Sequence, residues 1–343
     1  MRLPAAASPP TCRDVDLDLN GTTQRSGGPV TITIGRIGIF TTACEDLSYA
    51  LAQDLASEVE ELGYGAVWVP ETVGDALVTA TALLAATSKI AVATGITSIW
   101  ARDPTAMAGA QRRLTHAFPD RFVLGLGVSH GFMVEGIRRQ RFDKPLTRMS
   151  SYLDEMDAAR YTAALMDRVA DDGFAALAGA VESELPPRPP RVLAALGPRM
   201  LALSAEKADG ALLYFQTPEH TQLTREAVGP AAFLAPTQMV VLEEDPDSAR
   251  TAARRILSLY SFLPSFIDHF ARLGFAVEEL SDGGSNRLVD AVFARGDVDA
   301  VAKRIEEHLD AGADHVAVQV ITPTWPRDAP IRQWRDLAVA LVG

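Results

Sequence analysis

Short apolar runs alternate with amphipathic stretches along most of the chain. The apolar runs predict buried strands at residues 31–40, 65–71, 89–100, 121–128, 191–196, 210–215, 237–244 and 314–322. The segments between them show the 3.6-residue periodicity of helices, as in 47–64 and 246–260. Strands that are apolar on both faces and alternate with helices indicate a parallel sheet that helices cover on both sides.

Eight strand–helix units are the number that a closed (β/α)8 TIM barrel requires. The alternative is an open, doubly wound sheet, which would carry a glycine fingerprint in its first strand-to-helix turn. That turn, residues 38–46, reads GIFTTACED and lacks the fingerprint. The sequence therefore predicts one barrel domain over 31–343. We expect helical insertions at 147–180 and 258–292, and an unstructured tail over 1–30.

Composition narrows the class of protein. The chain has 343 residues and a formal net charge of −12, which argues against a nucleic-acid partner. The two cysteines, Cys12 and Cys44, form no CxxC pair and fit a reducing compartment. No apolar run reaches the roughly 18 residues of a membrane helix, and the first thirty residues lack the apolar centre of a signal peptide. We therefore expect a cytoplasmic protein without a membrane partner.

The stretch RFVLGLGVSHG, residues 121–131, places polar chemistry directly after a buried strand. It is not a GxGxxG motif, because His130 stands where the last glycine should be. It lies at the carboxyl end of the fourth strand, where barrel enzymes place active-site residues. In the functional interpretation, Gly125 and Gly127 leave room for a flat ligand, while Ser129 and His130 point into the barrel mouth. The alternative is a kinked strand end with a capping serine.

Other strand ends carry further candidates. Phe40 ends the first strand and Glu71 the second. After the fifth strand, Gly197 and Pro198 begin a helix whose free N–H groups favour an anion, with Arg199 as a charge partner. Each feature also has a structural interpretation: a core phenylalanine, a helix-capping acid and an ordinary helix start.

Several segments, in this order, resemble the luciferase-like monooxygenase superfamily and, within it, the deazaflavin (F420)-dependent oxidoreductases of actinobacteria. They are GYGAVWVPE, VATGITSIWARDP, RFVLGLGVSHGFMVEG, KPLTRMSSYLDE, LAALGPRMLALSAEKADGA, FQTPEH, DGGSNRLVDA and HLDAGADHVAVQV. The resemblance covers about residues 31–325. It implies a (β/α)8 barrel with coenzyme F420 over the strand ends, or with FMN as the alternative cofactor.

The resemblance also implies roles for individual residues. A non-prolyl cis peptide at Thr94-Gly95, with Ile96-Thr97 as the alternative, would support the cofactor ring from behind. The cofactor phosphate would lie on Leu196, Gly197 and Pro198, with Arg199 and the end of the sixth strand at Phe215 nearby. Gly127, Ser129 and His130 would face the ring.

At the position of the acid–base group, this sequence differs from the better-studied sugar-phosphate branch of the superfamily. Glu71 stands where that branch carries a catalytic histidine. We favour His130 as the acid–base residue because histidine titrates near neutral pH, whereas the pKa of a carboxyl group must be raised by burial. Glu71 is the second candidate. Either residue could instead have a structural role, Glu71 by holding a cofactor hydroxyl and His130 by bonding the backbone.

The remaining predictions concern partners. Aromatic residues suggest a pocket for a small hydrophobic substrate: Phe40, Trp68, Trp100, Phe132 and Phe215. A basic cluster could receive the oligoglutamate tail of F420 or could be a solvated surface: Arg138, Arg139, Arg141, Lys144 and Arg148. The histidine spacing predicts no metal site, and relatives suggest a homodimer. The predicted activity is hydride transfer by an F420-dependent oxidoreductase. The alternatives are an FMN-dependent monooxygenase that uses oxygen and a non-catalytic ligand-binding barrel.

Overall fold

The computed structural model describes residues 32–45, 47–72, 74–159, 188–326 and 328–343. The predicted tail over 1–30 lies outside the described residues. So does the part of the predicted 147–180 insertion that begins at residue 160.

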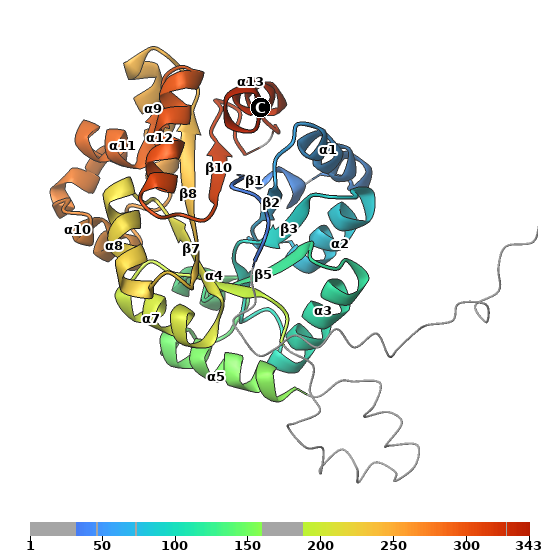
Figure 1. Ribbon diagram of the computed structural model, residues 1–343. Helices are drawn as coiled ribbons and strands as arrows, with labels where there is room; N and C mark the ends of the chain where they lie inside the picture. Colours follow the sequence, from blue (N-terminus) through green and yellow to red (C-terminus); the bar gives the residue numbers. More distant parts are fainter. Residues whose placement is uncertain (1–31, 46, 73, 160–187, 327) are drawn as a thin grey trace, which may run out of the picture.

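Parallel strands close into the predicted barrel (Figure 1). In barrel order they are β1 (Ile37–Phe40), β2 (Ala66–Val69), β3 (Ala91–Thr94), β5 (Phe122–Gly127), β6 (Arg191–Ala194), β7 (Gly210–Tyr214), β8 (Phe233–Val241) and β10 (Val316–Val320). Pairing of β10 with both β8 and β1 closes the ring. The TIM-barrel prediction is therefore confirmed.

Helices cover the outside of the barrel and follow the strands in sequence (Figure 1). They are α1 (Tyr49–Glu61), α2 (Ala76–Ala86), α3 (Pro104–Ala117), α5 (Pro145–Ala158), α7 (Pro198–Lys207), α8 (Pro218–Val228), α12 (Val298–Asp310) and α13 (Ile331–Leu341). The short helix α4 (Gly131–Gly136) follows β5 and is not part of this outer layer. The sequence shows where several begin. Asp103 and Thr217 accept hydrogen bonds from backbone N–H groups at the starts of α3 and α8, and each precedes a proline.

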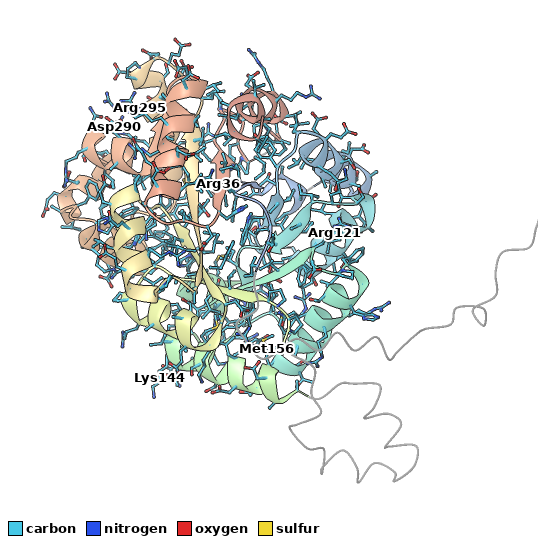
Figure 2. All side chains as sticks on the ribbon, in the orientation of Figure 1. Arg36, Arg121, Lys144, Met156, Asp290 and Arg295 are labelled. Atoms are coloured by element: carbon cyan, nitrogen blue, oxygen red, sulfur yellow. The ribbon has the colours of Figure 1, made fainter. Side chains whose placement is uncertain are left out.

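A lobe between β8 and β10 departs from the simple strand–helix alternation. It contains α9 (Pro246–Leu257), α10 (Pro264–Arg272), η4 (Val277–Gly283), α11 (Asn286–Val292) and β9 (Phe293–Arg295). The short strand β9 pairs with β8 and was not predicted. Asp290 connects the lobe by accepting hydrogen bonds from Arg250 and Arg295, and Figure 2 shows Asp290 close to Arg295. The lobe packs its own apolar cluster against the end of β7.

The third strand is interrupted where sequence reasoning placed one continuous strand. The β3–β5 ladder stops because the Thr94 hydroxyl donates to Gly125 O and accepts from Gly125 N, at 3.0 and 2.9 Å. The chain bulges and returns as β4 (Thr97–Ser98), which pairs with β5. Trp325-Pro326 is the one cis peptide bond in the described ranges. The predicted cis bond at Thr94-Gly95 or Ile96-Thr97 is therefore wrong, because the Thr94 side chain forms the bulge with trans peptides.

Three histidines are buried and neutral within the fold. Burial lowers the pKa of His269 and His315 to about 4 and that of His308 to about 3. An unfolded histidine titrates near pH 6.5, so below this pH the unfolded chain binds more protons and stability falls on acidification. We expect the free energy of unfolding to drop by about 1 kcal/mol per histidine, about 3 kcal/mol in total, between pH 6.5 and 5.5.

Urea unfolding across this pH range measures the effect. The His308 ring bonds Thr221 and Gln238, at 2.9 and 2.8 Å. His308→Gln keeps a donor and an acceptor at this position. The variant should therefore lose about a third less free energy of unfolding than wild type between pH 6.5 and 5.5. A free energy of unfolding that stays constant from pH 6.5 to 5.5 would contradict the assignment of three neutral histidines.

In the described part of the chain, no helix is long and apolar enough to cross a membrane.

Candidate active site

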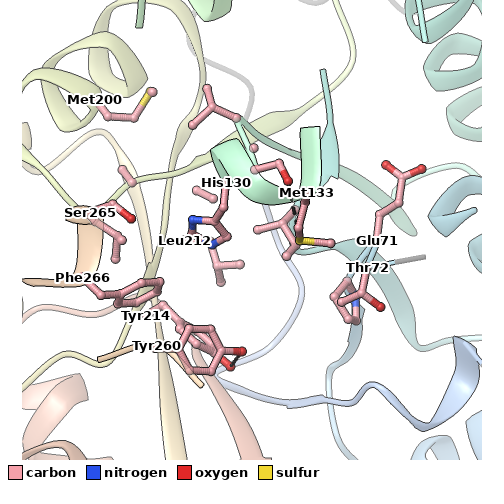
Figure 3. Close-up of a pocket in the computed structure, with 18 of the residues that line it drawn as sticks. Glu71, Thr72, His130, Met133, Met200, Leu212, Tyr214, Tyr260, Ser265 and Phe266 are labelled. Carbon is pink, nitrogen blue, oxygen red and sulfur yellow. Dashed lines mark hydrogen bonds between the residues drawn. The ribbon is translucent and has the colours of Figure 1, made fainter. Parts of the chain in front are cut away.

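A cavity of about 290 Å³ opens where the barrel strands end (Figure 3). It is close to the small end of ligand pockets, which measure roughly 300–1,000 Å³. Its wall is mostly apolar and consists of Phe40, Thr42, Pro70, Glu71, Thr72, Ile96, Gly127, Val128, Ser129, His130, Met133, Ala194, Ala195, Leu196, Gly197, Met200, Leu212, Tyr214, Tyr260, Ser265 and Phe266. Strands and helices far apart in sequence thus contribute to one site.

Many residues that the sequence predicted meet on this wall. They are Phe40, Glu71, Ile96, Gly127, Ser129, His130, Leu196 and Gly197. Other predicted site residues lie off the wall: Thr94, Gly95, Thr97, Trp100, Phe132, Pro198, Arg199 and Phe215.

His130 stands at the start of α4 with its side chain facing the cavity. Its ring lies parallel to the Phe132 ring at 6.1 Å and tilted against the Phe266 ring at 5.8 Å. No hydrogen bond to the imidazole is found among the described residues, and burial lowers its pKa below the usual 6.5. The imidazole is therefore neutral at pH 7 and can accept a proton from a bound molecule.

The two glycines of β5 have different functions. A Cβ on Gly125 would lie 1.7 Å from the Thr94 carbonyl oxygen. The absence of a side chain there allows the bulge of β3 to approach, and does not make room for a ligand. Gly127 does line the cavity, and its Cβ would make a tight 3.3 Å contact with Ile96. After it, Ser129 takes a left-handed conformation with φ 57°, which turns the chain into α4.

Glu71 is held by polar groups on one side of the cavity. Its Oε2 accepts the Ser98 N–H at 2.6 Å, and Oε1 lies 3.6 Å from Arg102 and 3.9 Å from Arg138. Burial raises the pKa of Glu71, while the Ser98 hydrogen bond and the arginines act in the opposite direction. Figure 3 shows its carboxylate pointing away from His130. This geometry favours a carboxylate that ties strand ends together over an acid–base group.

The turn after β6 forms an anion-binding geometry. Gly197 is the N-cap residue of the ten-residue helix α7 and makes no side-chain hydrogen bond to it. The backbone N–H groups at the helix N-terminus are therefore left for another acceptor. Arg272 from α10 donates to Leu196 O at 3.2 Å, and its Nη2 lies 3.6 Å from the position of a Cβ on Gly197. Arg199, which the sequence suggested as the charge partner, and Arg272 are both exposed and outside the cavity wall. Of the two, Arg272 is the one that hydrogen-bonds the turn, at Leu196 O.

Four aromatic residues predicted for the pocket lie elsewhere. Phe215 is fully buried in the lobe cluster. Trp68 fills the barrel interior, where its indole donates to His315 at 3.0 Å. Trp100 donates to Val128 O at 2.8 Å and so braces the end of β5. Phe132 is 56% exposed and contacts the outer side of the His130 ring. None of these four rings is part of the cavity wall.

The basic cluster is partly ion-paired. Arg141 lies 3.5 Å from Asp143, and Arg148 lies 3.7 Å from Glu155. Figure 2 shows Lys144 at the periphery of the molecule. These contacts favour the solvated-surface interpretation for most of the cluster, since exposed ion pairs of this kind contribute little. Arg138, beside Glu71, is the member nearest the cavity.

The polar residues at the site that sequence reasoning missed include Tyr214 and Tyr260 on the wall and Arg272 beside the Gly197 turn. Tyr214 ends a strand, and its position there was a usable signal. Tyr260 and Arg272 belong to the lobe, whose helical pattern does not reveal that it folds over the strand ends. No group of three metal-ligating side chains occurs in the ranges that the structure describes, and the absence of a metal stays a prediction.

The family comparison agrees with this geometry. Residues 35–315 match the family described as luciferase-like monooxygenase. The chain belongs to this family. Membership places it among oxidoreductases, as the sequence predicted.

Individual relatives extend the comparison of this family member. A Mycobacterium tuberculosis protein with the provisional name coenzyme F420-dependent oxidoreductase Rv3520c is 28% identical over 330 residues, 83% of this chain and 92% of the relative. Two solved structures share the fold. An F420-dependent secondary alcohol dehydrogenase in complex with an F420-acetone adduct superposes with a TM-score of 0.65, 16% identity, and coverage of 90% of this chain and 98% of that one. The oxygenating constituent of 3,6-diketocamphane monooxygenase from Pseudomonas putida, in complex with FMN, superposes with a TM-score of 0.64 and 13% identity. This match covers 89% of this chain and 96% of that one.

Proposed function

We propose that this family member is an F420-dependent oxidoreductase that transfers hydride between the deazaflavin and a small hydrophobic substrate. One observation carries the proposal: the open N-terminus of α7 at Gly197, with Arg272 beside it, borders a mostly apolar cavity. An anionic cofactor with a flat ring needs both features. The name of the Mycobacterium tuberculosis relative supports F420 as that cofactor.

The residues present fit such a cofactor. Gly197 leaves open space that a side chain would fill toward Arg272. The N-terminus of α7 and the Arg272 guanidinium would bind the phosphate. Ile96, Gly127 and Leu196 would contact the apolar ring, and the lobe residue Phe266 would exclude water.

Bound F420 would supply the two-electron hydride chemistry. The chain would supply position and proton transfer. His130 would accept or donate the proton at its imidazole, because it is neutral and has no other hydrogen-bond partner among the described residues. The rings of Phe132 and Phe266 flank the His130 imidazole, with centroid distances of 6.1 and 5.8 Å.

A second candidate is an FMN-dependent monooxygenase. The superposition with the Pseudomonas putida oxygenating enzyme favours it, since the same fold there holds FMN. The open helix terminus would serve either cofactor's phosphate. The cytoplasmic location and the homodimer are further proposals, which rest on composition and on resemblance.

An anaerobic reaction separates the two candidates. Reduced F420 is mixed with the protein and a panel of small ketones and aldehydes, and the oxidised deazaflavin is followed by absorbance. The proposal predicts oxidation that requires both protein and carbonyl compound and proceeds without oxygen. Oxygen uptake with reduced FMN, and no reaction with reduced F420, would overturn it.

Arg272 and Arg199 offer a matched pair of variants. Arg272→Gln removes the cation next to Gly197, so we expect about a tenfold increase in the Kd for F420, the value of one charge-assisted hydrogen bond. Arg199→Gln makes the same change on an arginine that is likewise exposed but, among the described residues, forms no hydrogen bond to the turn, and we expect less than about a twofold effect. Fluorescence titration measures both. A larger loss in Arg199→Gln would restore the original assignment of the phosphate partner.

A further inference from the structure

Two tyrosine hydroxyls meet on one side of the mostly apolar cavity (Figure 3). Tyr214 ends β7, and Tyr260 lies in the lobe between α9 and α10. Their hydroxyl oxygens are 3.4 Å apart, and Tyr214 donates to Gln319 Oε1 at 2.9 Å. Gln319 comes from β10 and is 1% exposed. The pair is thus fixed from behind by a buried amide of the barrel interior.

The hydrogen-bond directions leave one donor underused. A tyrosine hydroxyl has a single hydrogen, and that of Tyr214 goes to Gln319. The Tyr260 hydrogen can then reach the Tyr214 oxygen only across 3.4 Å, well beyond the usual 2.7–2.8 Å or so. With the Gln319 amide reversed, Tyr214 accepts from Gln319 and donates to Tyr260, and the Tyr260 hydrogen is free. In both arrangements Tyr260 can donate to a closer oxygen in the cavity.

Two other polar side chains on the wall, Glu71 and Thr72, already have partners. Glu71 accepts from Ser98 and faces two arginines. The Thr72 hydroxyl donates to Glu45 at 2.5 Å. Burial raises the pKa of both Tyr214 and Tyr260, so the two hydroxyls keep their protons across neutral pH. The buried Gln319 Nε2, which has no partner among the described residues, adds a second donor behind them.

We infer that Tyr260, positioned by Tyr214 and Gln319, binds the oxygen of a carbonyl or alcohol group on an otherwise hydrophobic substrate. This rests on the proposed function in that the oxygen belongs to the substrate and not to the cofactor. On a mostly apolar wall, the Tyr260 donor favours a molecule whose apolar body carries an oxygen that reaches it, because a buried donor without a partner is costly. The lobe, which supplies Tyr260, thereby determines substrate class.

A pair of isosteric probes tests the inference without turnover. Acetophenone and α-methylstyrene have the same shape. They differ only in that the carbonyl oxygen of acetophenone is replaced by a methylene group in α-methylstyrene. Binding to the cofactor-free protein is followed by NMR of methionine methyl groups, because Met133 and Met200 line the cavity. We expect the ketone to bind about five- to tenfold more tightly, the value of one neutral hydrogen bond. In Tyr260→Phe and Tyr260→Met the ratio of the two Kd values should fall to within about twofold of one.

Tyr64→Phe is the matched control. Tyr64 is buried and donates to Trp334 O at 2.8 Å, before the start of β2 and away from the cavity wall. This variant should keep the wild-type ratio. An unchanged ratio in Tyr260→Phe overturns the inference.

Repeating the ketone titration with saturating F420 separates this inference from the proposed function. Continued ketone binding supports a substrate subsite. Competition between ketone and F420 assigns the tyrosines to the cofactor and overturns the inference. If F420 does not bind while the ketone preference holds, the proposed function fails and the oxygen subsite stands.

Discussion

Gly197→Glu should weaken F420 binding by at least about 100-fold, since it removes two or more charge-assisted contacts. Gly197 leaves the N-terminus of α7 uncapped, and its Cβ would lie 3.6 Å from the Arg272 guanidinium. A glutamate would place its carboxylate against Arg272 and occupy the position of the cofactor phosphate. The variant should fold normally, because the backbone at Gly197 has φ −114° and suits any residue. Fluorescence titration of wild type and variant measures the loss.

Gly109→Glu makes the same chemical change elsewhere. Gly109 lies on α3, and nothing lies within 4 Å of its would-be Cβ. The Gly109→Glu variant should bind F420 with wild-type affinity. The comparison therefore separates a local effect at Gly197 from a general effect of one added negative charge. If Gly197→Glu bound F420 with wild-type affinity, the phosphate would lie elsewhere.

Gly125→Ala should cost more than about 4 kcal/mol of folding free energy, or prevent folding. The new Cβ would lie 1.7 Å from the Thr94 carbonyl oxygen, a backbone atom of a neighbouring strand. Neither strand can move freely, because the Thr94 hydroxyl bonds both backbone groups of Gly125. Thermal unfolding at a fixed scan rate, with the amount of soluble protein, measures the effect.

Gly127→Ala is the paired variant, two residues along the same strand. Its Cβ would approach only the Ile96 side chain, at 3.3 Å, which can shift slightly. We expect a cost of about 1 kcal/mol or less in stability. Because Gly127 lines the cavity, any loss should appear in ligand binding. Equal stability of the two variants would show that the bulge of β3 does not depend on Gly125.

The barrel was predictable because its strands are apolar on both faces, and that pattern is local. The positions of Phe40, His130 and Gly197 followed, since strand ends of a barrel meet at one mouth. Glu71 was also placed correctly on the wall, but its partners Arg102 and Arg138 were not foreseen. Partners depend on side-chain directions that strand periodicity does not give.

The predicted site residues that lie off the cavity wall do so for a common physical reason. Thr94 replaces ladder hydrogen bonds with its side chain, so the shape of the bulge could not be read from apolar patterning. Phe215 takes a positive φ of 52°, and its side chain is buried in the lobe cluster. Tyr260 and Arg272 reach the site through the tertiary packing of the lobe, which lies far from the mouth in sequence. Local pattern therefore located the site, and long-range packing determined its polar groups.

The most direct test of the account is a parallel titration of the cofactor-free protein with F420 and with FMN, followed by tryptophan fluorescence. The account predicts saturable binding of F420 in the micromolar range and FMN binding at least about tenfold weaker, a difference of 1.4 kcal/mol or more. Tighter binding of FMN would contradict the deazaflavin assignment and favour the oxygen-using alternative. Binding of neither cofactor would contradict the catalytic interpretation of this cavity.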